Sequence, residues 1–323
     1  MKKKIYITRQ IPDIGPDMLR SVGHEVVVSE KDGVLTHTEL ITELNKHNPD
    51  AVLCLLTDHI DAEVYDAAPN AKIFANYAVG YGNLNIDDAM ERGVTITNTP
   101  GVLTDTVAEH TIALILAVSN RIAEADRFTR AGKYEGWAPM LLLGTDLKGK
   151  TLGVLGAGRI GSRVAEIAHK GLGMDIMYFD IKENEFLNNE LGAEYRSDAE
   201  DVLRDADVVT VHVPLLDSTR GMLNKEKLEI MKPGSILVNT SRGKVIDESA
   251  LVDALKAGTI KRAALDVFED EPELADGLAE LDNVIITPHI ASATEETRGK
   301  MSQMAARNII DFLDGKEPAN VVV

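Results

Sequence analysis

The 323-residue sequence contains a single cysteine, Cys54, and no run of about 20 consecutive apolar residues that could span a membrane. One cysteine excludes an intrachain disulfide and is typical of proteins in the reducing cytoplasm. No cluster of cysteine and histidine has the spacing of a zinc site. The basic start, MKKKIYITRQ, continues directly into a strand-like segment and does not resemble a signal peptide. We therefore expect a cytoplasmic protein that binds no metal and enters no membrane.

Positive charge is also scarce, because 34 lysines and arginines stand against 52 aspartates and glutamates, a formal net charge of −18. A surface of this sign repels a phosphate backbone, so nucleic acid is not an expected partner. Apolar residues make up 44% of the sequence, and 323 residues suffice for a large core and two domains.

Short apolar strands alternate with helical stretches, a pattern typical of α/β folds with parallel sheets. In the first third, strands are predicted at 4–8, 51–56, 72–77 and 94–98, and helices at 37–47 and 62–69. One long helix is predicted from about Thr106, where Thr106 and Glu109 have the spacing of a capping box, to near Gly132.

A second series of strands begins at Thr151. These strands are predicted at 151–155, 175–180, 207–214, 235–240, 262–268 and 283–289, with a short edge strand at 193–196. The tail is predicted as an amphipathic helix that Ser292 and Glu295 open, that runs to Leu313 and that ends at Gly315. The final VVV could pair as a further strand.

A glycine-rich segment, GAGRIG (156–161), follows a predicted strand and opens a predicted helix, which is the context that dinucleotide binding requires. Gly156 permits the tight turn, Gly158 lets the backbone approach a pyrophosphate, and Gly161 lets helix and strand pack closely. The helix N-terminus offers free amides to the phosphates. Asp180, at the end of the next strand, can accept hydrogen bonds from ribose hydroxyls and repel a 2′-phosphate. The motif therefore predicts NAD(H) in preference to NADP(H), although Lys182 lies nearby.

Three candidate catalytic side chains, Arg242, Glu271 and His289, stand just past the ends of later strands. Ligands of open parallel sheets bind outside the carboxyl ends of the strands, so the three can converge. Arginine can hold the carboxylate of a 2-keto acid with two hydrogen bonds. Protonated histidine can give a proton to the ketone oxygen as hydride reaches the carbon, and a carboxylate beside the ring favours and orients the imidazolium.

Each of these residues also has a purely structural interpretation. His289 can pack at a strand end, Arg242 can be a surface ion-pair partner, and Glu271 is one of several acids in EDEPE (269–273). His212 is the second candidate histidine, although packing inside a strand or a role on the adenine side suits it better. His59 and His110 are further candidates.

The order and spacing of four motifs resemble the D-isomer-specific 2-hydroxyacid dehydrogenases, over essentially the whole chain. The motifs are GAGRIG (156–161), NTSRG (239–243), DVFEDEP (266–272) and TPHIASAT (287–294). Residues 76–110 resemble that family's link between its two domains. Within the family, LLTDHID (55–61), NYAVGYGN (76–83) and WAPMLLLG (137–144) look most like the glyoxylate/hydroxypyruvate reductases.

The resemblance implies an α/β fold of two Rossmann-like domains with parallel sheets and an interdomain cleft. The first, flavodoxin-like and substrate-binding, would comprise 1–99 plus 292–323, and the dinucleotide-binding domain 100–291. Arg242, Glu271 and His289 match the family's catalytic residues, with His289 as proton donor in NADH-dependent reduction of a small 2-keto acid to the D-2-hydroxy acid. The family also implies a homodimer through the helix from Thr106. The remaining implied roles are substrate binding by Leu56, Val79, Gly80 and Arg242, and cofactor binding by Gly156, Gly158, Arg159, Ile160, Gly161, Asp180, Pro214, Thr240, Ser241, Asp266 and His289.

Related activities stay open as alternatives. D-lactate and D-glycerate dehydrogenases are not distinguished by sequence, and Leu141 stands where some relatives place a tryptophan, which leaves the substrate preference open. A phosphoglycerate dehydrogenase would want a cation in CLLTDHI (54–60), which has neither lysine nor arginine. Formate dehydrogenases resemble the family but have glutamine where Glu271 stands. A binding protein of a different class, an NAD(H)-sensing co-repressor on the same fold, is the non-enzymatic alternative.

Overall fold

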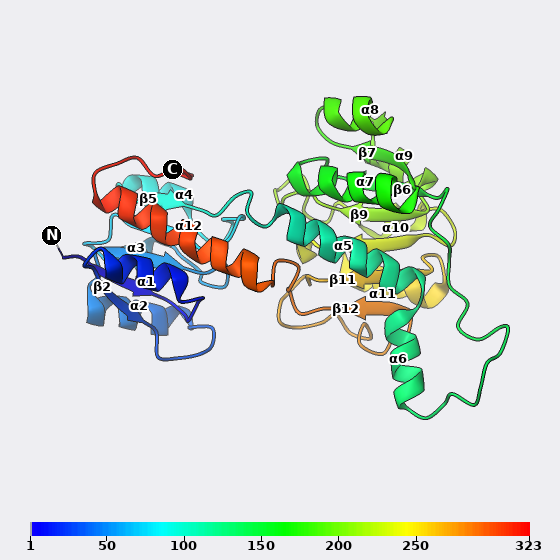
Figure 1. The fold of residues 1–323 in the computed structure, drawn as a ribbon, viewed down its shortest axis with the longest axis horizontal. Helices are drawn as coiled ribbons and strands as arrows, with labels where there is room; N and C mark the ends of the chain where they lie inside the picture. The colour runs from blue at the N-terminus through cyan, green and yellow to red at the C-terminus, as the bar shows by residue number, and fades with distance from the viewer. Residues whose placement is uncertain (1) are drawn as a thin grey trace. The chain divides into compact units, whose positions relative to one another are not determined.

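The computed structural model describes residues 2–323, and its strands form two separate parallel sheets (Figure 1). Each sheet belongs to its own compact unit. Unit 1 comprises residues up to Leu103 together with Ala293–Val323, and unit 2 comprises Thr104–Ser292. The predicted α/β fold with parallel sheets is confirmed. No helix within residues 2–323 is long and apolar enough to cross a membrane.

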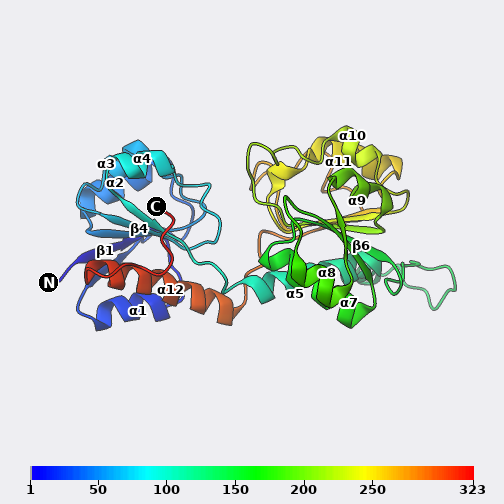
Figure 2. The same ribbon diagram turned by 90° about the horizontal axis from the view of Figure 1, so that it is seen from above.

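Unit 1 has a five-stranded sheet in the order β2-β1-β3-β4-β5. Helices α1 and α12 lie against one face, and α2, α3 and α4 lie on the other (Figure 2). The strands alternate with helices because each apolar strand must be covered on both faces. The bounds are β1 Lys4–Ile7, α1 Ile14–Ser21, β2 Glu25–Val28, α2 His37–His47, β3 Ala51–Cys54, α3 Ala62–Asp66, β4 Ile73–Asn76, α4 Ile86–Glu91, β5 Thr95–Thr97 and α12 Glu295–Leu313.

Unit 2 has a seven-stranded parallel sheet in the order β12-β11-β10-β9-β6-β7-β8. Helices α5, α7 and α8 cover one face, and α9, α10 and α11 cover the other (Figure 2). The bounds are α5 Thr104–Ser119, α6 Ile122–Arg130, β6 Thr151–Leu155, α7 Arg159–Leu172, β7 Asp175–Phe179, α8 Glu185–Leu191, β8 Glu194–Arg196, α9 Ala199–Asp205, β9 Val208–Val211, α10 Lys225–Glu229, β10 Ile236–Asn239, a 3-10 turn η1 Gly243–Val245, α11 Glu248–Ala257, β11 Arg262–Leu265 and β12 Val284–Ile286.

The long helix predicted from Thr106 to Gly132 is wrong in two respects. It begins earlier, at Thr104, and it divides into α5 and α6 at Arg121, whose φ of 59° lies in the left-handed region. A segment more than 20 residues further along the chain stabilises the break, because the amide of Thr145 donates to the carbonyl of Ser119 at 3.0 Å. A Cβ on Gly144 would lie 2.9 Å from the same carbonyl oxygen, so the returning chain packs directly on the end of α5.

The tail helix begins later than predicted, because Thr294 rather than Ser292 caps it by accepting from the amide of Thr297. Its end at Gly315 agrees with the prediction, since Gly315 has a φ of 75°. The final valines do pair, with an antiparallel bridge from Val321 to Thr97. Strand β2 and helices α1 and α4 were not predicted. They are short elements, and α1 depends on close packing, since a Cβ on Gly15 would lie 2.4 Å from Ser302 O in α12.

Candidate active site

Three neighbouring strands of unit 2 bring candidate residues to one edge of the sheet. Strands β10, β11 and β12 are adjacent and parallel. Arg242 follows β10 by three residues, Asp266 follows β11 at once, and His289 follows β12 by three residues. Because all three strands point the same way, these residues share the carboxyl edge of the sheet.

His289 and Glu271 form a direct pair. The ring Nδ1 of His289 lies 2.9 Å from Glu271 Oε2, and the two side chains are 27% and 33% exposed. The other carboxylate oxygen, Oε1, accepts from the amide of Phe268 at 3.1 Å, which fixes the carboxyl plane. With Nδ1 bonded to a carboxylate, Nε2 is the ring nitrogen that can exchange a proton with a substrate.

The environment of Glu271 favours its charged form. Burial acts to raise the pKa of this carboxyl, but the hydrogen bond and charge of His289, the Phe268 amide and the charge of Arg242 outweigh it. The pKa of Glu271 is therefore below its usual value. An ionised carboxylate beside the ring favours the imidazolium form of a histidine that serves as a proton donor.

The backbone places the His289 ring at this point through an uncommon conformation. His289 has a φ of 52°, in the left-handed region, and its amide donates to the carbonyl of Asp266 at 2.9 Å. Non-glycine residues rarely adopt this region, although asparagine, aspartate and histidine tolerate it best. Such strain clusters at functional sites when the surrounding contacts hold it in place.

Asp266 supplies much of that support. Its side chain is fully buried and accepts from Thr287 Oγ1 at 2.6 Å and from the amides of Ile290 and Ala291 at 2.9 and 2.8 Å. Burial acts to raise the pKa of Asp266, but its hydrogen bonds bring it below the usual value. The ring Nε2 of His110 lies 3.5 Å away. The carboxylate thus holds the backbone before and after His289, a structural role in addition to the cofactor contact that was predicted for Asp266.

Arg242 stands in a turn that Asn239 shapes. The buried Asn239 side chain donates to the carbonyl of Arg242 at 3.0 Å and accepts from Ser241 N and Oγ at 3.0 and 2.9 Å. Within residues 2–323 the Arg242 guanidinium makes one side-chain hydrogen bond, from Nη1 to Ser241 O at 2.6 Å. Burial lowers the pKa of Arg242, against the charge of Glu271. Its other N–H groups can therefore bind an anionic ligand.

The turn of Arg242 and the segment of Glu271 touch at Gly243. A Cβ on Gly243 would lie 1.9 Å from the backbone carbon and oxygen of Phe268 and 2.4 Å from the amide nitrogen of Glu269. Only a residue without a side chain permits this approach. The sequence places Gly243 in the NTSRG motif, and this contact between two turns explains why glycine is required there.

The glycine-rich turn fits a dinucleotide. A Cβ on Gly156, at φ 96°, would lie 2.7 Å from His212 C, and one on Gly161 would lie 2.0 Å from Gly156 O. Both glycines are thus required by packing. Gly158 differs, because a Cβ there meets nothing within 4 Å. It is the N-cap residue of α7, whose first residues are Arg159 and Ile160. The space beside Gly158 fits a pyrophosphate at the N-terminus of α7.

Asp180 lies against this turn. Its Oδ2 accepts from the amide of Ala157 and its Oδ1 from the amide of Ile181, both at 2.7 Å. Each oxygen keeps a further lone pair that can accept from a ribose hydroxyl. Asn184 reinforces the turn by donating to Ala157 O at 2.8 Å and to Ser162 Oγ at 2.9 Å.

The remaining cofactor candidates lie at the same carboxyl edge. Pro214 is exposed after β9, and Thr240 Oγ1 lies 2.9 Å from Thr111 Oγ1 of α5. His212 is held by Thr210, whose Oγ1 is 2.9 Å from Nε2, and burial lowers the pKa of His212 to about 3. A ring kept neutral at ordinary pH suits packing, as the sequence interpretation favoured, rather than proton donation.

In unit 1, the predicted substrate loop follows β4. Asn76 Nδ2 donates to Gly80 O at 2.9 Å, and Asn98 Nδ2 donates to Val79 O at 2.8 Å. Within residues 2–323 the amides of Val79 and Gly80 donate no hydrogen bond, so both can bind a carboxylate. Leu56 follows β3 in the neighbouring loop and is partly buried.

A buried network joins these two loops of unit 1. Asn83 Nδ2 donates to the carbonyls of Leu55 and Asp58 at 3.0 and 3.1 Å. Asp58 Oδ2 accepts from Thr8 Oγ1 at 2.5 Å and from the amide of Leu55 at 2.7 Å, and burial raises its pKa. Sequence reasoning missed Asn76, Asn83 and Asp58, although a polar residue at the end of an apolar strand could have been noticed.

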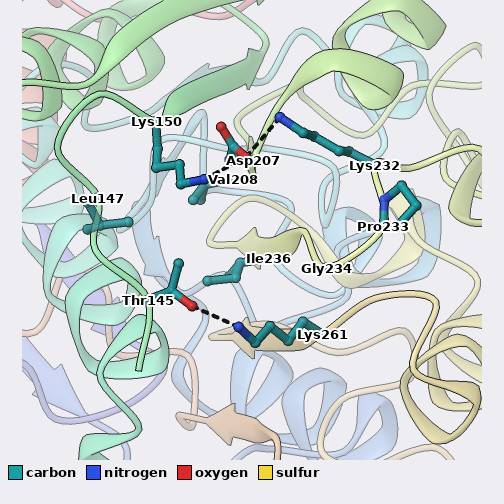
Figure 3. Close-up of a pocket in the computed structure, with 10 residues that line it drawn as sticks. All are labelled: Thr145, Leu147, Lys150, Asp207, Val208, Lys232, Pro233, Gly234, Ile236 and Lys261. Carbon is teal, nitrogen blue, oxygen red and sulfur yellow. Dashed lines mark hydrogen bonds and ion pairs between the residues drawn. The ribbon is translucent and has the colours of Figure 1, made fainter. Parts of the chain in front are cut away.

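A well-formed hollow in unit 2 lies elsewhere. Its volume is about 340 Å³, and it opens at the amino ends of β6, β9, β10 and β11, between Lys150, Lys232 and Lys261 (Figure 3). Lys150 and Lys232 are paired with Asp207. No candidate residue lines it. Within residues 2–323 no group of three histidine, cysteine or acidic side chains could hold a metal ion.

Comparison with known proteins assigns the chain to one family. A model of the D-isomer specific 2-hydroxyacid dehydrogenase NAD binding domain matches residues 112–291. A glyoxylate reductase of Korarchaeum cryptofilum is 47% identical over 324 residues, covering 100% of this chain and 96% of the relative. A crystal structure of a Thermus thermophilus protein has a TM-score of 0.92 and 41% identity, covering 99% of this chain and 100% of that one. The crystal structure of an NADPH-dependent glyoxylate/hydroxypyruvate reductase of Sinorhizobium meliloti has a TM-score of 0.87 and 31% identity, and the match covers 100% of this chain and 98% of that one.

Proposed function

Since the chain belongs to the D-isomer-specific 2-hydroxyacid dehydrogenase family and carries its NAD-binding domain, we propose that it reduces glyoxylate or hydroxypyruvate with NADH, with His289 as proton donor. The observation that carries the proposal is the 2.9 Å contact between His289 Nδ1 and Glu271 Oε2 at the carboxyl edge of the sheet. Full-length similarity to enzymes named glyoxylate reductase supports the choice of substrate.

In the proposed reaction, Arg242 binds the substrate carboxylate and polarises the neighbouring carbonyl. The nicotinamide, when bound, supplies the hydride. His289 gives the Nε2 proton to the carbonyl oxygen as charge develops there, and Glu271 stabilises the imidazolium before transfer. Within unit 1, the free amides of Val79 and Gly80 and the side chain of Leu56 stay predicted substrate contacts.

Substrate choice is tested by the rate of NADH oxidation with glyoxylate, hydroxypyruvate, pyruvate and 3-phosphohydroxypyruvate. We expect the first two to have the highest kcat/KM, because the loop 54–60 has no cation for a phosphate. A preference for pyruvate or the phosphorylated acid would replace the substrate assignment and keep the proposed triad. Absence of turnover on all four, with NADH-dependent binding of a protein partner, would favour the NAD(H)-sensing alternative.

Cofactor choice is expected to depend on Asp180. Its charge should repel the 2′-phosphate of NADPH, so we propose a preference for NADH, against the NADPH dependence of the Sinorhizobium relative. Asp180→Asn keeps an acceptor for the Ala157 amide but removes the charge. We expect the ratio of kcat/KM for NADPH to that for NADH to rise about tenfold, since one such charge contact is worth on the order of 1–2 kcal/mol. An unchanged ratio would remove Asp180 from cofactor selection.

We also propose that the protein is a homodimer. The apolar residues of α5 are largely buried within unit 2, whereas α6 has no buried residue. The segment that follows α6 extends away from its unit in both views (Figures 1 and 2). It exposes Tyr134, Trp137, Met140 and Leu143, with Trp137 84% exposed. Several large apolar side chains exposed on one segment favour residues 122–143 as the interface, rather than α5 alone.

Trp137 is the only tryptophan, so its fluorescence reports on this segment directly. In a dimer that covers it, we expect an emission maximum shifted to the blue and protection from iodide, both lost on dilution as the sedimentation coefficient falls. A monomeric sedimentation coefficient together with the emission of a fully hydrated tryptophan would contradict the proposed dimer.

A further inference from the structure

Glu248 is a buried acid that the proposed reaction does not use. It is the first residue of α11 and its side chain is 2% exposed. The cap of α11 is supplied by its neighbour Asp247, which accepts from the amide of Ala250. Glutamate is almost never fully buried unless it is paired or hydrogen-bonded, so the contacts of this carboxyl explain why it is there.

The carboxyl of Glu248 holds the start of the segment that carries Glu271. Its Oε1 accepts from the amide of Glu269 at 2.7 Å. The amide of Glu248 in turn reaches Glu269 Oε2 at 3.4 Å. Glu269 is thus attached to the start of α11 by two hydrogen bonds, two residues before Glu271.

The first of these attachments lies next to the hydrogen bond that orients Glu271. The Glu269 amide held by Glu248 directly follows the Phe268 amide that donates to Glu271 Oε1. The second oxygen of Glu271 then meets His289 at 2.9 Å. A shift of residues 268–269 would move the carboxylate relative to the imidazole.

A carboxylate is a costly choice for a purely structural role here. Burial raises the pKa of Glu248, and the nearby charges of Glu269 and Asp270 raise it further. A neutral side chain would avoid this repulsion. What the carboxyl provides against this cost is an acceptor for the amide of Glu269.

We infer that Glu248 is a positioning residue that holds Glu269 so that Glu271 meets His289 in the geometry for proton transfer. The inference rests on the proposed function for the role of Glu271, but the attachment itself does not. The two parts are therefore tested with different measurements.

The attachment is tested by hydrogen exchange of peptides covering residues 267–276 in the wild type, Glu248→Ala, Glu248→Gln and the control Glu273→Ala, an exposed acid of the same segment. We expect roughly tenfold faster exchange in Glu248→Ala, because the amide of Glu269 loses its acceptor. Glu248→Gln keeps an acceptor oxygen and should remain near the wild type. Wild-type exchange in Glu248→Ala would overturn the inference, even if no 2-keto acid is turned over.

The coupling to Glu271 is tested by the acid limb of kcat/KM for glyoxylate reduction. His289, the Phe268 amide and Arg242 hold the pKa of Glu271 below its usual value. If Glu271 is displaced, its carboxylate loses part of this stabilisation and its pKa rises. As the pH is lowered, activity is then lost at a higher pH than in the wild type. Removing only the charge of Glu248 should instead lower the pKa of Glu271, because a nearby negative charge raises the pKa of an acid.

Glu248→Ala should therefore move the acid limb upward and lower kcat/KM by about 10–100-fold, the scale of a small misplacement of a catalytic group. Glu248→Gln should leave the limb in place or move it slightly downward. Affinity for NADH should be unchanged in both variants. Acid limbs that move equally in the two variants would show an electrostatic effect only and would overturn the positioning role. A wild type without turnover would refute the proposed function and leave the exchange result to decide the attachment.

Discussion

Replacing His289 with asparagine should lower kcat/KM for glyoxylate reduction by about 10²–10⁴-fold, the usual contribution of a positioned general acid. Asparagine is the informative substitution because His289 has a φ of 52°. Asparagine tolerates this left-handed conformation, so the variant removes the proton donor and keeps the loop, whereas alanine would add backbone strain.

The control for this variant is His24→Asn, which changes a histidine of unit 1 whose Nδ1 accepts from the amide of Lys3. It should keep wild-type activity. His289→Asn should also keep the wild-type melting temperature. Activity of His289→Asn within about threefold of the wild type would remove His289 from the proposed mechanism, because a general acid contributes about 10²-fold at least.

The second large effect is expected at Gly243. A methyl group there would meet the backbone of Phe268 at 1.9 Å, and backbone cannot turn aside as a flexible side chain can. Gly243→Ala should cost roughly 1–3 kcal/mol of unfolding free energy, the usual cost of overpacking. It should also lower kcat/KM by about 10²-fold or more, because Arg242 precedes the contact and the Phe268 amide orients Glu271.

Gly171→Ala is the matched control, because Gly171 lies in α7 and a Cβ there meets nothing within 4 Å. It should leave activity unchanged and raise stability by about 0.5–1 kcal/mol, since glycine is unfavourable inside a helix. Assays of Gly243→Ala are made at a temperature where circular dichroism shows it folded. Wild-type kcat/KM under that condition would refute the coupling of the two turns.

The sequence was most informative where the structure is set by local chemistry. The strand before GAGRIG, the helix after it and Asp180 at the end of β7 are all neighbours in the chain, so their arrangement follows from local rules. The strand ends that carry Arg242 and His289 were also predictable, because apolar β-branched runs stop at polar residues. Parallel pairing then brings those ends to one edge.

Features that depend on distant contacts could not be predicted in this way. The break at Arg121 exists because Gly144 and Thr145 return to the end of α5, and nothing near Arg121 in the sequence announces it. Asn239 and Glu248 look from the sequence like a strand end and an ordinary first-turn acid. Their importance depends on burial and on the amides they meet, which only the folded chain defines.

One product analysis tests the proposal that this chain reduces a 2-keto acid to the D-2-hydroxy acid. Purified protein is incubated with NADH and hydroxypyruvate, and the configuration of the glycerate formed is determined by chiral chromatography. We expect stoichiometric NADH oxidation and D-glycerate as the product. L-glycerate, or no oxidation of NADH with either hydroxypyruvate or glyoxylate, would contradict it.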